Sequence, residues 1–96
     1  MDHQLVKEIL ELSIKATHNT KHEVFFRYSP NVEFVEVDIY ENGWESPDHE
    51  LRIIVDLKDK KSAQHLKRVK EILNDLIETK QLQKKWMKEI RYGFFW

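Results

Sequence analysis

The chain has 96 residues, a formal net charge of −1, no cysteine and two isolated glycines, Gly43 and Gly93. These features exclude disulfides, a thiol nucleophile and cysteine-ligated metals, and they exclude the glycine-rich loops that bind nucleotide phosphates. The length fits one domain over residues 1–96. No apolar run is long enough to span a membrane, so we expect a cytoplasmic protein without membrane contact.

The first twenty residues have the spacing of an amphipathic helix. Apolar side chains recur at intervals of three and four residues, and the polar run Thr17–Thr20 ends the pattern. Asp2 is a candidate for the N-cap residue. The apolar positions are Leu5, Val6, Ile9, Leu10, Leu12, Ile14 and Ala16.

Three strands are expected next, over Glu23–Tyr28, Glu33–Glu41 and Leu51–Leu57. Each run alternates between apolar and polar side chains, which is the pattern of a sheet with one buried face. Ser29-Pro30-Asn31 predicts a turn between the first two strands, and Glu41–Glu50 predicts a long polar loop before the third.

Residues 60–78 carry the strongest helical pattern, with one apolar stripe from Leu66 to Ile77. Leu82 and Trp86 fall on the opposite side of the helical wheel, so we expect a break near Thr79 and a second short helix over 81–91. The predicted fold is therefore α+β, a two-layer α-β-β-β-α arrangement. Its three-stranded antiparallel sheet carries the helices on one face, and a short extra helix follows at the C-terminus.

The outward positions of the predicted strands mix aromatic and apolar side chains with charged ones. Cross-strand ion pairs and aromatic contacts on an ordinary surface would explain this mixture. The same face could instead bind a ligand or partner, or lie under the C-terminal aromatic residues. The outward residues are Phe25, Arg27, Phe34, Glu36, Asp38, Tyr40, Arg52, Ile54 and Asp56.

Charge is unevenly distributed along the chain. Residues 22–57 contain nine acidic and two basic residues, whereas residues 58–96 contain five acidic and eleven basic ones. The basic segment could contact nucleic acid phosphates, or it could be a solvated helix face that complements the acidic strands. The candidate nucleic-acid contacts are Lys60, Lys61, Lys67, Arg68 and Lys70.

Aromatic residues gather at the C-terminus, where chain ends are usually polar. They could pack over the core, join two copies of the chain, or form a binding centre for another protein. Trp44 in the long polar loop is a further candidate anchor. The candidate partner-binding residues are Trp86, Tyr92, Phe94, Phe95, Trp96 and Trp44.

The sequence contains no pattern that indicates catalysis. No serine lies in a nucleophile elbow, and we expect no metal or cofactor, because no third ligand joins the pair His18 and His22. All five histidines are expected to be solvated.

Two short motifs resemble the double-stranded RNA-binding domain, which shares the order α-β-β-β-α. Lys60-Lys61-Ser62-Ala63 is similar to the motif that opens that family's second helix and grips phosphates, and Pro47-Asp48-His49 is similar to its minor-groove loop. This resemblance implies nucleic-acid binding through the 58–91 region. In general style the chain also looks like small accessory proteins of bacteriophages of low-GC bacteria, many of which inhibit host proteins by binding them.

The leading prediction is a non-catalytic protein-interaction module, an inhibitor or accessory protein of the phage type that binds another protein or a second copy of itself. The alternative is a nucleic-acid-binding module.

Overall fold

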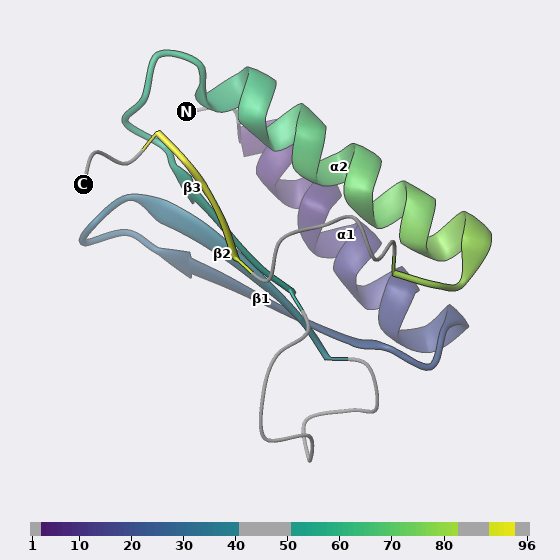
Figure 1. Cartoon of the computed structure of the whole chain (residues 1–96). Helices are drawn as coiled ribbons and strands as arrows, with labels where there is room; N and C mark the ends of the chain where they lie inside the picture. Colours follow the sequence, from purple (N-terminus) through teal and green to yellow (C-terminus); the bar gives the residue numbers. More distant parts are fainter. Residues whose placement is uncertain (1–2, 41–50, 83–88, 94–96) are drawn as a thin grey trace.

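In the computed structural model, which describes residues 3–40, 51–82 and 89–93, the chain forms two helices on one face of a four-stranded sheet (Figure 1). The α+β class and the two-layer arrangement agree with the sequence. The elements in chain order are α1 (His3–Asn19), β1 (Glu23–Ser29), β2 (Phe34–Tyr40), β3 (Leu51–Asp56), α2 (Ser62–Thr79) and β4 (Glu89–Tyr92).

Both long helices form where the apolar periodicity predicts them. α2 ends because Lys80 adopts a left-handed conformation with φ of 61°, and its N–H donates to the Leu76 carbonyl at 2.8 Å. Before the helix, the Asp59 carboxylate accepts the Lys61 N–H at 2.8 Å, so Asp59 orders the turn that leads into α2.

The sheet order is β1-β2-β3-β4. β1, β2 and β3 form the antiparallel arrangement expected from the sequence, with Phe26 opposite Val37 and Val37 opposite Ile53. β4 lies parallel to β3, with Ile90 beside Ile53. The described part of the sheet is therefore mixed, and the prediction of three antiparallel strands misses β4.

The prediction of a helix over residues 81–91 is wrong where the structure describes that range, because Glu89–Tyr92 is a strand. Residues 83–88 lie outside the described residues. In β4 the apolar Ile90 and Tyr92 alternate with Glu89 and Arg91, which suits a half-buried strand. β3 supplies the hydrogen-bonding edge that this short segment requires, and that edge is not visible from local periodicity.

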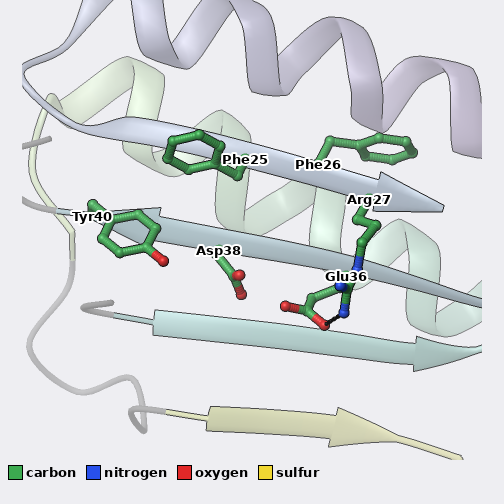
Figure 2. Close-up of a pocket in the computed structure, with 6 residues that line it drawn as sticks. All are labelled: Phe25, Phe26, Arg27, Glu36, Asp38 and Tyr40. Carbon is green, nitrogen blue, oxygen red and sulfur yellow. Dashed lines mark hydrogen bonds and ion pairs between the residues drawn. The ribbon is translucent and has the colours of Figure 1, made fainter. Parts of the chain in front are cut away.

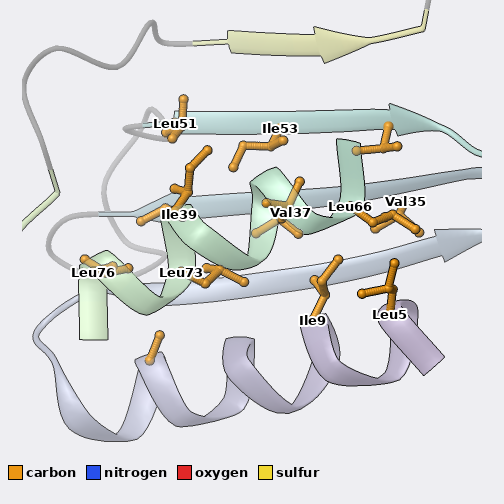
Figure 3. Packing of buried hydrophobic residues seen from close by; sticks show 14 of the residues in the cluster. Leu5, Ile9, Val35, Val37, Ile39, Leu51, Ile53, Leu66, Leu73 and Leu76 are labelled. Carbon is orange, nitrogen blue, oxygen red and sulfur yellow. The ribbon is translucent and has the colours of Figure 1, made fainter. Parts of the chain in front are cut away.

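The core lies between the helices and the sheet (Figure 3). Leu5 and Ile9 of α1 face Val35 and Val37 of β2, while α2 contributes a stripe that includes Leu73. Burying each such side chain stabilises the fold by about 1.5–3 kcal/mol. The remaining buried members of the cluster are Ala16, Ile39, Leu51, Ile53, Val55, Leu57, Leu66, Val69, Ile72 and Leu76.

Candidate functional site

Both helices cover the same face of the sheet, and within the described residues no helix or strand covers the other face (Figure 1). We call this second face the open face. Strand alternation places on it the outward residues that the sequence predicts. β4 adds Glu89 opposite Arg52 and Arg91 opposite Ile54. The open face is therefore a charged and aromatic surface directly above the core.

Glu36 is the centre of an ion-pair network on this face. Its Oε1 lies 2.8 Å from Nη2 of Arg27, and its Oε2 lies 3.3 Å from Nε of Arg52. Glu36 is only 7% exposed, because its neighbours on β1 and β3 flank it. Burial acts to raise its pKa, but a hydrogen bond from Asp38 and the two arginine charges lower it below the usual 4.5.

Asp38 lies two residues further along β2 and behaves in the opposite way. Arg52 Nε donates to its Oδ1 at 3.0 Å. Burial and the hydrogen bond to Glu36 nevertheless raise the pKa of Asp38 to about 6. Asp38 is therefore the carboxyl of this pair that takes up a proton first as the pH falls, and Arg52 compensates only part of the cost of charging it.

A shallow pocket of about 460 Å³ lies over these groups, lined by Phe25, Phe26, Arg27, Glu36, Asp38 and Tyr40. The rings of Phe25 and Tyr40 meet edge to face, with 5.3 Å between their centroids. Figure 2 shows these two rings near the carboxyl of Asp38, whereas the Phe26 ring points towards α1. The pocket thus combines aromatic walls with a partly compensated carboxyl, which is the chemistry that recognises a cationic group.

The candidate nucleic-acid residues, which lie just before α2 and along it, are not all brought together. Lys61, Lys67 and Arg68 line a second pocket of about 570 Å³. Arg68 is already paired with Glu71 at 2.6 Å, and Lys70 turns towards α1, where its Nζ lies 2.8 Å from Glu8. Lys60 is exposed beside the start of the helix.

Of the candidate partner-binding residues, Trp44, Trp86, Phe94, Phe95 and Trp96 lie outside the described residues. Tyr92 is on β4, packs against the core and stacks on His65 of α2, with 4.9 Å between ring centroids.

The expectation that all histidines are solvated is wrong for His22, which is 2% exposed. Its backbone N–H donates to the Thr20 hydroxyl at 3.1 Å in the short connection from α1 to β1. This tight turn places the imidazole inside the protein.

Sequence reasoning missed a group of exposed apolar residues. The sequence pattern counts Leu10 and Ile14 among the apolar positions of the first helix, but in the structure they are 41% and 52% exposed. On a helical wheel they lie about 100° or more from the core-facing residues Ile9 and Ala16, and this offset is the signal that could have found them.

Comparison with protein-family models gives no match, and neither the curated proteins nor the solved structures contain a match. None of the helices in the described ranges is long and apolar enough to cross a membrane. Over the same residues, no group of three or more histidine, cysteine or acidic side chains could hold a metal ion.

Proposed function

We propose that this protein is a non-catalytic protein-interaction module of the cytoplasm. Its open face binds a partner protein that inserts a lysine or arginine side chain into the pocket over β1 and β2. The pocket, in which Asp38 stands beside Phe25 and Tyr40, is the observation that carries the proposal.

The charges in the pocket favour a cationic guest. Glu36 already has two arginine partners, but the pKa of Asp38 is raised to about 6 despite the nearby Arg52. An incoming cation would favour the charged form of Asp38 and would therefore bind more tightly above this pKa than below it. Phe25 is 46% exposed, and its ring can contact the aliphatic part or the charged end of the inserted lysine or arginine side chain.

A phage-type inhibitor or accessory role is consistent with such a face. A small protein that binds a basic side chain of its target can block a functional site there without catalysing a reaction.

A titration of the full chain with acetyl-arginine-amide, followed by NMR, tests the pocket directly. We expect shifts at Phe25, Arg27, Asp38 and Tyr40 that weaken several-fold between about pH 7.5 and pH 5, as protonation of Asp38 predicts. Acetyl-norleucine-amide is the uncharged control.

The variant Asp38→Asn should lose most of this response, whereas Asp75→Asn, the same change on α2, should retain it. An equal response in both variants, or none in the wild type, would refute the cation pocket.

The alternative function, nucleic-acid binding, is supported by the pocket that gathers Lys61, Lys67 and Arg68. Its test is a titration with duplex RNA and duplex DNA at low salt, where phosphate contacts are strongest. Lys67→Glu should then weaken binding, and absence of binding at low salt would end this alternative.

A further inference from the structure

Two aromatic rings form a corner in the pocket on the open face. Phe25 of β1 and Tyr40 of β2 both line this pocket, with 5.3 Å between the ring centroids and 85° between the ring planes. Two rings at a right angle can present both their faces to one small group, and the face of an aromatic ring carries negative potential. Phe25 is exposed and Tyr40 is half-buried, so an incoming group can reach the rings. The corner therefore suits a group that is cationic and has an apolar surface.

Asp38 places a carboxyl beside this corner. It lies directly opposite Phe25 in the pairing of β1 with β2, which brings the two Cβ atoms within about 4.5–5.5 Å of each other. Figure 2 shows its carboxyl near the rings of Phe25 and Tyr40. Arg52 Nε donates to Oδ1 of Asp38, but a carboxylate has about four acceptor positions. Asp38 can therefore accept one further N–H from a group held between the rings.

Arg27 also lines the pocket, but its charge is directed elsewhere. Its Nη2 lies 2.8 Å from Oε1 of Glu36, and its guanidinium lies 5.6 Å from the centroid of the Phe34 ring. Figure 2 shows the Arg27 side chain extending to Glu36 and away from the two rings of the corner. The carboxylate of Glu36 compensates this positive charge, so Arg27 does not exclude a cation from the corner.

We propose that the basic side chain bound in this pocket is a dimethylated lysine of the partner protein. This inference rests on the proposed function and names the chemical class of the inserted side chain. An unmethylated ammonium is compact and strongly hydrated, so its transfer from water to an aromatic corner is costly. Methyl groups reduce that hydration and contact the ring faces, while the retained charge still attracts the rings.

Asp38 determines the favoured number of methyl groups. A dimethylated ammonium has one N–H, which can donate a charge-assisted hydrogen bond to the carboxylate while both methyl groups contact the rings. A trimethylated ammonium has no N–H to donate, and a monomethylated one brings a second N–H that needs another acceptor. We therefore expect the dimethylated form to bind most tightly and the unmethylated form to bind most weakly.

A titration of the full chain with four acetyl-lysine-amides, carrying none to three methyl groups on Nζ, tests the inference by NMR at pH 7.5. The dimethylated compound should bind about five-fold more tightly than the unmethylated one, and also more tightly than the trimethylated one. Equal affinities of the four compounds, or tightest binding of the trimethylated one, would overturn this inference and leave the cation pocket intact. Absence of binding by all four and by acetyl-arginine-amide would refute both proposals.

The variant Phe25→Leu tests the aromatic corner, because it retains an apolar side chain but removes one ring. The preference for the dimethylated over the unmethylated compound should fall below about two-fold. Tyr28→Leu is the matched control, since Tyr28 lies on the same strand, is also exposed and does not line the pocket. This control should keep the full preference. Circular dichroism checks that both variants fold, and an unchanged preference in Phe25→Leu would contradict the proposal.

Discussion

Arg52 donates from Nε to Oδ1 of Asp38 at 3.0 Å, joining β3 to β2 across the open face. This contact is too weak to hold Asp38 ionised at mild acidity, because burial and the hydrogen bond to Glu36 raise its pKa to about 6. The network therefore contains a carboxyl whose charge depends on pH, and this dependence can be measured as stability.

The free energy of unfolding should depend on pH through Asp38. Its pKa rises on folding from 3.8 to about 6, so folding favours the protonated form. That stabilisation is complete below the unfolded pKa and is lost as the pH rises through the folded one. We expect the wild type to lose about 1–2 kcal/mol relative to Asp38→Asn between about pH 4 and pH 7.

Urea unfolding of both proteins across this range measures the difference. Glu36 acts in the opposite direction, because its lowered pKa contributes stability that is present above pH 4.5 and is lost as the pH falls below that value. Parallel pH profiles for the two proteins would show that Asp38 does not titrate as described.

Arg52 should contribute more to stability than Arg27. Arg52 contacts both Glu36 and Asp38 and is 35% exposed in its side chain, whereas Arg27 contacts Glu36 and is 63% exposed. Arg52→Ala should cost about 2–3 kcal/mol and Arg27→Ala less than about 1 kcal/mol, because the first change leaves two largely buried carboxyls with weaker compensation. Urea unfolding at pH 7.5 measures both, and equal costs would contradict the central place of Arg52.

Ile9 and Ile14 on α1 provide a matched test of the core. Ile9 is fully buried and Ile14 is 52% exposed. Ile9→Ala should lower the free energy of unfolding by about 2–5 kcal/mol, and Ile14→Ala should change it by less than about 0.5 kcal/mol. A large cost for Ile14→Ala would mean that α1 is rotated relative to the sheet.

Gly93 should tolerate no side chain. Its φ is +89°, and a Cβ there would lie 2.8 Å from Cβ of Asp59. Gly93→Ala should therefore destabilise the protein by about 1–3 kcal/mol, through both backbone strain and collision. In an Asp59→Gly background the same change should cost less, because only the backbone strain remains. If Gly93→Ala costs as much in that background as in the wild type, the whole loss of stability comes from backbone strain.

Much of the fold follows from local patterns. The helical spacing of α1 and α2 and the alternation of β1, β2 and β3 each depend on residues close in sequence, and these predictions are confirmed. The faces of the strands follow as well, because parity assigns Glu36 and Asp38 to the side away from the core. The sequence therefore predicts which residues of β1, β2 and β3 lie on the open face.

Two features could not be predicted from local patterns. β4 has four residues and pairs with β3, from which it is separated in the sequence by the whole of α2. Local periodicity therefore does not reveal that this segment is a strand. The opposite pKa shifts of Glu36 and Asp38 depend on which arginine reaches each carboxyl and how deeply each is buried.

The near-neutral charge of the chain gives no indication of this arrangement. By itself the sequence determined the class of fold, the helices and three of the strands, because periodicity and turn chemistry act over a few residues. Only the tertiary structure decided that β4 extends the sheet, that Asp38 is a poorly compensated carboxyl, and that Leu10 and Ile14 stand exposed beside β1. These features arise where segments distant in sequence meet, since desolvation and packing depend on neighbours in space.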